Sequence, residues 1–131
     1  MEISYLPIIA AAVVHFVIGM LWYSPLLFVK PWAKEAGISE ADMNKKEGMA
    51  ITLMSALASS LVMAYVLMKF LPAGGDLKAA LKVGAWLWLG FFATSQLGSV
   101  LWMKKSLQFY AINAGYWLVS LLAISAVLVS L

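Results

Sequence analysis

The chain has 131 residues, of which 64% are hydrophobic and only 11% are charged, whereas a soluble domain carries roughly 25% charged residues. Too few ionic side chains are present to cover a soluble core with a wettable surface, so the composition excludes an ordinary soluble domain. The net charge is +3, but the nine basic residues are all lysines scattered between apolar blocks, which excludes a basic face for nucleic acid.

Four apolar runs are each long enough to cross a membrane as a helix, for which about 20 residues suffice. We expect the spans at about residues 4–24, 48–70, 82–103 and 107–129. Backbone amides in lipid must be paired within a helix or a closed barrel, and the runs lack the alternating pattern of barrel strands. The predicted fold is therefore all-α, with one domain over residues 1–131. It is an integral membrane bundle of four transmembrane helices, with a short interfacial helix between helices one and two.

The end of the first span is predicted to reach the membrane surface. Pro25 disfavours helical geometry at Ser24, so the helix is expected to end or kink there. The following short helix is expected to place its tryptophan among lipid headgroups while its lysines reach for water. The predicted interfacial motif consists of Trp22, Tyr23, Ser24, Pro25, Lys30 and Trp32.

The connections predict how the helices are oriented. The third connection, residues 104–106, is so short that helices three and four are expected to form an antiparallel hairpin. Six lysines lie in the first and third connections and three in the second, which favours the first and third inside. Both termini are then expected outside, although the lysines of the second connection leave a dual or reversed topology open.

Candidate chemistry within the membrane depends mainly on His15. The runs 3–29, 48–68, 83–103 and 106–131 contain no charged residue, which disfavours a transporter coupled through a carboxylate. His15 is the only histidine and has no sequence partners for a metal site. We favour an interhelical hydrogen bond for His15, with proton transfer as the functional alternative.

Other polar side chains are expected to meet in the bundle interior. They line a ligand site in one interpretation and only hold helices together in the other, at about 0.6 kcal/mol for each hydrogen bond. The predicted polar or ligand-lining residues are His15, Thr94, Gln96, Asn113 and Tyr116.

A line of residues at four-residue intervals runs along the third span. It comprises Trp86, Gly90, Thr94, Gly98 and Trp102. Small residues let helices approach closely, so helix packing within the chain is the first interpretation and a contact between copies is the alternative.

Motifs for chemistry are otherwise missing from the sequence. There is no cysteine, and no phosphate-binding loop, zinc-protease helix or nucleotide-binding fingerprint is present. We therefore predict no catalytic, cofactor-binding or metal-binding residue and expect no enzyme.

The chain resembles a bacterial family of small four-span membrane proteins known only as a domain of unknown function. The likeness rests on Trp22-Tyr23-Ser24-Pro25-Leu26-Leu27-Phe28, Lys30, Trp32, Lys34, Gly37, Gly90-Phe91, Thr94, residues 97–101, residues 112–116 and Leu118-Val119. The chain departs from the family pattern at Val29 and Met103-Lys104-Lys105. The resemblance implies a multi-pass protein of the bacterial cytoplasmic membrane and transfers no substrate, cofactor or catalytic residue.

Three hypotheses for function follow. The first is a non-enzymatic, self-associating bundle that binds or passes a small or amphipathic molecule. The second is a structural or accessory subunit that packs against another membrane protein, and the third is a membrane enzyme that uses His15. The expected partners are the lipid bilayer and further copies of the chain, with no nucleic acid.

Overall fold

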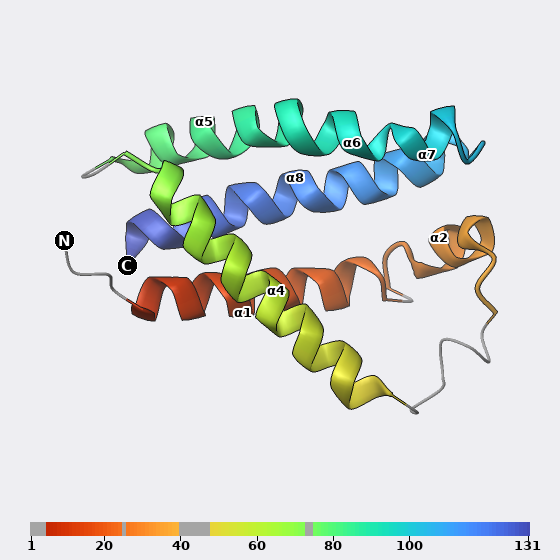
Figure 1. Ribbon diagram of the computed structural model, residues 1–131, viewed down its shortest axis with the longest axis horizontal. Helices are drawn as coiled ribbons and strands as arrows, with labels where there is room; N and C mark the ends of the chain where they lie inside the picture. The colour runs from red at the N-terminus through yellow and green to blue at the C-terminus, as the bar shows by residue number, and fades with distance from the viewer. Residues whose placement is uncertain (1–4, 25, 40–47, 73–74) are drawn as a thin grey trace.

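The computed structural model describes residues 5–24, 26–39, 48–72 and 75–131. All regular secondary structure within these residues is helical, which confirms the predicted all-α class. The helices are α1 (Tyr5–Trp22), α2 (Val29–Ala36), α4 (Met49–Phe70), α5 (Leu77–Leu87), η1 (Trp88–Ala93), α6 (Thr94–Gln96), α7 (Gly98–Leu101) and α8 (Leu107–Ser130), of which η1 is a π-helix (Figure 1).

Three helices, α1, α4 and α8, are long and apolar enough to cross a membrane. They have 18, 22 and 24 residues and a mean hydropathy of 1.9 to 2.0, and at about 1.5 Å rise per residue they match a hydrocarbon core of about 30 Å. Large apolar side chains such as Leu6, Ile51 and Met54 are exposed on them. Such a surface is costly in water, so these helices indicate a membrane protein.

The third predicted span requires a correction. It was expected as one helix over residues 82–103, but the structure divides this stretch into α5, η1, α6 and α7. Three, rather than four, of the described helices are therefore individually long enough to span. Gly90 has a low helix propensity, and its carbonyl accepts a hydrogen bond from Thr94 Oγ1 at 2.8 Å, a side-chain contact that bends helices.

Contacts with α8 hold the π-helix at both of its ends. The first residue of η1, Trp88, donates its indole N–H to the Ala114 carbonyl at 2.8 Å. The carbonyl of the last residue, Ala93, accepts from the Tyr110 hydroxyl at 2.8 Å. The wide turn is therefore attached to α8 by two hydrogen bonds, and the one from Tyr110 satisfies a backbone carbonyl of η1, as irregular helical turns in membranes require.

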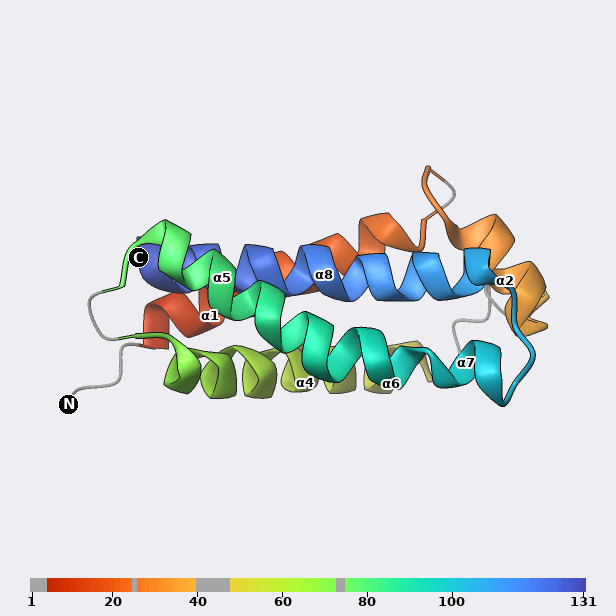
Figure 2. The same cartoon turned by 90° about the horizontal axis from the view of Figure 1, so that it is seen from above.

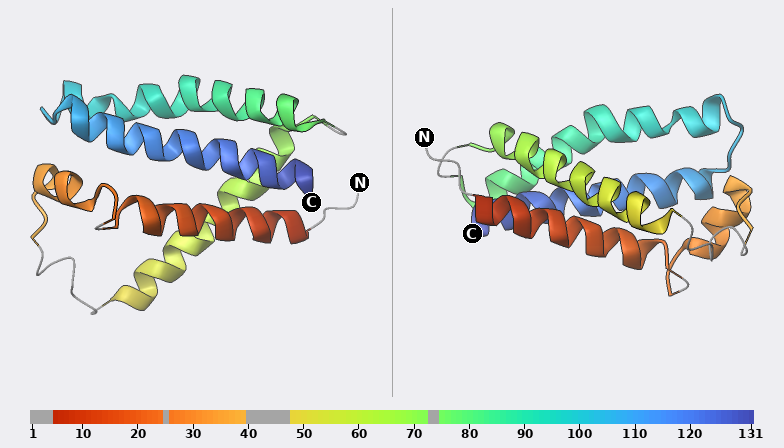
Figure 3. Two further views of the ribbon diagram at one scale, coloured as in Figure 1. Left: turned by 180° about the vertical axis from the view of Figure 1, so that it is seen from behind. Right: turned by 60° about the horizontal axis from the view of Figure 1, so that its bottom comes forward.

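Helix α8 lies at the centre of the fold and contacts each of the other helices. It runs antiparallel to α1 and to the α5–α7 segment, and α4 crosses obliquely (Figure 1, Figure 2). The beginning of α1 and the end of α8 lie at the same end of the molecule (Figure 3). The apolar core lies towards this end and consists of Ile8, Ala11, Ala64, Leu67, Leu121, Ile124 and Leu128.

The α5–α8 hairpin packs through small residues other than the predicted line. Ala80 and Gly84 are buried at the contact, whereas Trp86 and Trp102 are 71% and 84% exposed and a Cβ on Gly90 would meet nothing within 4 Å. The interpretation of that line as packing within the chain is therefore wrong. In an α-helix, residues four apart are rotated by about 40° relative to each other, so such a line slowly winds around the helix. The π-helix η1 has more residues per turn, which reduces this winding and keeps Gly90 and Thr94 on the exposed face with Trp86 and Trp102.

The short helix α2 forms where the sequence predicts one. It ends at Gly37, whose φ of 76° suits glycine and whose N–H bonds the Ala33 and Lys34 carbonyls. The Lys105 ammonium donates to the Glu35 carbonyl near the end of α2. This bond ties α2 to the connection before α8.

Candidate functional site

His15 lies where three helices meet. It belongs to α1, is only 4% exposed, and forms a hydrogen bond with one side chain from each of two other helices. Its Nδ1 is 2.8 Å from Ser60 Oγ of α4, and its Nε2 is 2.8 Å from the Tyr116 hydroxyl of α8. Both ring nitrogens are therefore paired, and the imidazole links the three helices that are long and apolar enough to cross a membrane.

The hydrogen-bond partners of Ser60 determine which nitrogen of His15 carries the proton. The Ser60 hydroxyl is also 3.0 Å from the Ala56 carbonyl and donates to it, so its oxygen accepts from the N–H at Nδ1 of His15. Nε2 is then the acceptor for the Tyr116 O–H. This assignment gives a neutral imidazole in which each nitrogen has a partner, as burial away from water requires.

Aromatic rings surround His15 on the α8 side. The imidazole stacks on Tyr116 at 5.5 Å between ring centroids and lies 5.5 Å from Trp117. Gly19 lets the Tyr116 hydroxyl approach α1, because a Cβ there would lie 3.0 Å from that oxygen. The sequence did not predict Gly19, Ser60 or Trp117 as neighbours of His15. Gly19 is a small residue one helical turn after His15, and Ser60 belongs to a line of small residues on α4, but no pattern pointed to Trp117.

A pocket of about 350 Å³ opens beside this cluster, and we call it the His15 pocket. Its polar part is formed by His15, Ser59, Ser60 and the two tyrosines, and its remaining walls are apolar. The lining residues are His15, Phe16, Gly19, Met20, Tyr23, Leu53, Ala56, Ser59, Ser60, Tyr116 and Trp117. A mostly apolar cavity of this size with a few converging polar groups has the character of a small-molecule site.

Of the predicted polar residues, the structure brings Tyr116 to His15 and places Asn113 beside the cluster. Asn113 Oδ1 accepts from the Tyr23 hydroxyl at 2.6 Å, and the Tyr23 ring lies 5.3 Å from Tyr116. Asn113 therefore fixes the end of α1 against α8.

Thr94 and Gln96 are not brought to the His15 pocket. Thr94 is exposed and its hydroxyl donates to its own helix, and Gln96 is half-buried. Neither residue lines the pocket, whose walls come from α1, Tyr23, α4 and α8.

The predicted interfacial motif forms a turn that is attached to α8. Trp22 donates its indole N–H to the Ile112 carbonyl at 2.8 Å, and the Ser24 hydroxyl donates to the Leu21 carbonyl at 2.6 Å. The ring of Trp32 lies 5.1 Å from that of Tyr23. These contacts fold the chain back after α1.

Lys30 and Pro25 complete the predicted motif. Lys30 is exposed on α2. Helix α1 ends at Trp22, which confirms the expected end of the first helix near residues 22–25. Pro25 itself lies outside the described residues.

Titratable groups do not gather at a metal site in the part of the chain that the structure describes. Over these residues no three His, Cys, Asp or Glu side chains lie close enough to hold an ion. The polar groups that line the His15 pocket are hydroxyls and one imidazole, which can form hydrogen bonds inside apolar walls.

Comparison with protein families gives one match. A family model described as "Protein of unknown function (DUF1761)" matches residues 6–129, which confirms the expected resemblance to a family of unknown function. The comparisons with curated proteins and with solved structures gave no match.

Proposed function

We propose, on the premise that the chain belongs to the DUF1761 family of proteins of unknown function, that it binds a small or amphipathic molecule in the His15 pocket. The proposed protein is a non-enzymatic bundle of four transmembrane helices. The observation that carries the proposal is the pocket of about 350 Å³ in which polar groups from α1, α4 and α8 converge. Such a site favours a molecule with one hydrogen-bonding group and an apolar body.

The proposed bundle includes a fourth crossing by the α5–α7 segment, and the helical continuity of this segment supports it. The residues at its internal boundaries, Leu87, Ala93 and Leu97, all keep right-handed helical dihedral angles. The segment runs alongside α8, and Trp88 and Tyr110 bond it to α8 at the π-helix. An irregular helix stabilised in this way is compatible with spanning a membrane.

Self-association is part of the proposal, and the outer face of the third helical segment supports it. Gly90 and Thr94 are exposed there between the rings of Trp86 and Trp102. Small residues on an exposed membrane face allow close approach of another helix. The same face equally suits an accessory subunit that packs against a different membrane protein, which is the alternative function.

A membrane enzyme using His15 is the second alternative, and one observation favours it. The fold places Ser60 Oγ 2.8 Å from His15 Nδ1, which is the contact between nucleophile and base that serine chemistry needs. Ser60 is only 3% exposed and is bonded to the Ala56 carbonyl. We rank this alternative lower because the hydroxyl proton is directed at that carbonyl rather than at the imidazole.

Filling the His15 pocket is expected to abolish binding. Ala56→Trp places an indole in the pocket, whereas Ala58→Trp adds the same ring at another exposed position of α4 that does not line it. In lipid nanodiscs, 4-hydroxybenzophenone is expected to label pocket residues of the native protein and of Ala58→Trp on irradiation. Labelling should be lost in Ala56→Trp, as peptide mass spectrometry will detect.

Equal labelling of the two tryptophan variants at the pocket residues would contradict the proposal. Labelling spread evenly over the exposed surface of all three proteins would do the same. Circular dichroism spectra that match among the three proteins control for misfolding.

We further propose that the protein resides in a bacterial cytoplasmic membrane, as the family resemblance implies, and that both termini lie outside, from the lysine count of the connections. A reporter that is active only in the cytoplasm is expected to be inactive when fused after Leu131. The same reporter inserted between Lys104 and Lys105 is expected to be active. Activity of the fusion after Leu131 would overturn this orientation.

A further inference from the structure

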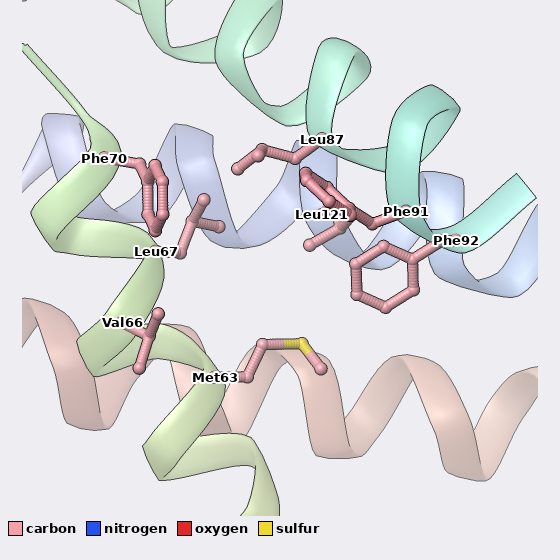
Figure 4. A pocket seen from close by; sticks show the side chains of 8 residues that line it. All are labelled: Met63, Val66, Leu67, Phe70, Leu87, Phe91, Phe92 and Leu121. Atoms are coloured by element: carbon pink, nitrogen blue, oxygen red, sulfur yellow. The ribbon is translucent and has the colours of Figure 1, made fainter. Parts of the chain in front are cut away.

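A second groove, lined only by apolar side chains, lies further along α4 than the His15 pocket, towards the end of this helix. Its volume is about 230 Å³, and Figure 4 shows its side chains facing each other across the space between α4, α8 and the α5–η1 segment. We call it the apolar groove. Its lining residues are Met63, Val66, Leu67, Phe70, Leu87, Phe91, Phe92 and Leu121.

The crossing of α4 creates this groove. Helix α4 packs against α1 and crosses α8, and it diverges from η1 beyond the crossing (Figure 1). The rims carry exposed rings, with Phe70 58% and Phe91 67% exposed. An apolar space that is open at its side admits an occupant directly from the surrounding lipid.

The dimensions of the groove fit one alkyl chain. Along α4 it extends from Met63 to Phe70, which is about 10 Å of helix at 1.5 Å per residue. The volume of about 230 Å³ is below the range of roughly 300 to 1,000 Å³ that drug-sized ligands occupy. The absence of a polar lining side chain requires that any headgroup lie outside the groove.

Positive charge lies at the end of the groove where such a headgroup would emerge. Lys69 adjoins Phe70, and Lys78 and Lys82 lie at the start of α5, all three exposed. Asp76 is the acidic residue described in this connection, and its carboxylate accepts the Ala79 N–H as the N-cap of α5. This end therefore offers more cationic groups than acidic ones.

From these two features we propose that the apolar groove holds one acyl chain of an anionic membrane lipid, whose headgroup lies at Lys69, Lys78 and Lys82. Lysines near a membrane surface attract anionic headgroups at about 1 kcal/mol each, and the apolar walls pack against the chain through van der Waals contacts. The proposal is independent of the proposed function, because the groove and the His15 pocket share no lining residue.

Photolabelling with two matched lipids tests the proposal. Native protein in nanodiscs is irradiated with phosphatidylglycerol or phosphatidylcholine that carries a diazirine in one acyl chain. We expect phosphatidylglycerol to label residues 87–92 preferentially. Val66→Trp fills the groove and should abolish this labelling, whereas Val62→Trp, which is exposed on α4 outside the groove, should leave it intact.

Charge variants test the headgroup position. Replacing Lys69, Lys78 and Lys82 with glutamine should reduce the preference for phosphatidylglycerol by about fivefold or more, since one lysine contributes about that factor. The same replacement at Lys30, Lys34 and Lys104, which are exposed in α2 and before α8, should leave it unchanged.

Three results would overturn the proposal. They are equal labelling by the two lipids, labelling that persists in Val66→Trp, and an equal effect of the two lysine triplets. Crosslinks from the groove to a second copy of the chain, in place of lipid, would likewise assign the groove to a protein interface.

Discussion

Replacing His15 with alanine is expected to lower the free energy of unfolding by about 2 to 3 kcal/mol. The change removes hydrogen bonds to Ser60 and Tyr116 on two other helices, at about 0.6 kcal/mol for each bond in a membrane protein. It also leaves a cavity beside Tyr116 and Trp117, and a void under packed rings adds to the loss. Unfolding in mixed micelles by increasing mole fractions of sodium dodecyl sulfate, followed by circular dichroism, measures the difference.

Two further variants separate packing from hydrogen bonding at this position. His15→Phe keeps a ring against Tyr116 and loses both polar contacts, so the expected loss is about 1 kcal/mol. Thr94→Ala removes an exposed hydroxyl bonded within its own helix, and a change within about 0.5 kcal/mol is expected. If His15→Ala unfolds like Thr94→Ala, His15 does not hold the three helices together.

Apolar runs were sufficient to predict α1, α4 and α8, because a membrane-spanning helix is determined mainly by the length and hydropathy of a local stretch. They were not sufficient for the segment after α5. The π-helix η1 depends on hydrogen bonds from Trp88 to Ala114 and from Tyr110 to Ala93. These bonds form only when α8 is already alongside, and no local pattern in the sequence contains that information.

The partner of His15 shows the same limit within the candidate site. The sequence identified Asn113 and Tyr116 as polar groups on one helix, but their spacing could not determine which of them faces α1 at His15. Tyr116 does so because Gly19 admits its hydroxyl, and Asn113 pairs with Tyr23 instead. Ser60 completes the cluster, although it lies 45 positions after His15 along the chain.

The most damaging single substitution is expected at a glycine that sequence reasoning did not select. A Cβ on Gly84 would lie 2.9 Å from Ser125 Oγ and 3.1 Å from the Leu121 carbonyl oxygen. The serine side chain can rotate away, but the carbonyl belongs to the backbone of α8 and is held by the helix. Gly84→Leu is therefore expected to push α5 off α8 and cost about 3 kcal/mol of the free energy of unfolding, at the upper end of overpacking effects.

Gly90 supplies the matched control for this substitution, since it lies one and a half turns further along the same segment with open space around it. A Cβ there meets nothing within 4 Å, so Gly90→Leu gains helix propensity without a clash and should stabilise the fold by about 0.5 kcal/mol. The two variants add the same side chain to the same segment, and their opposite signs in detergent unfolding would place the close contact between α5 and α8 at Gly84. Equal effects would mean that α5 does not approach α8 there. Gly84→Ala should fall between the two, because its methyl group meets the Leu121 carbonyl but needs a shift of only a few tenths of an ångström.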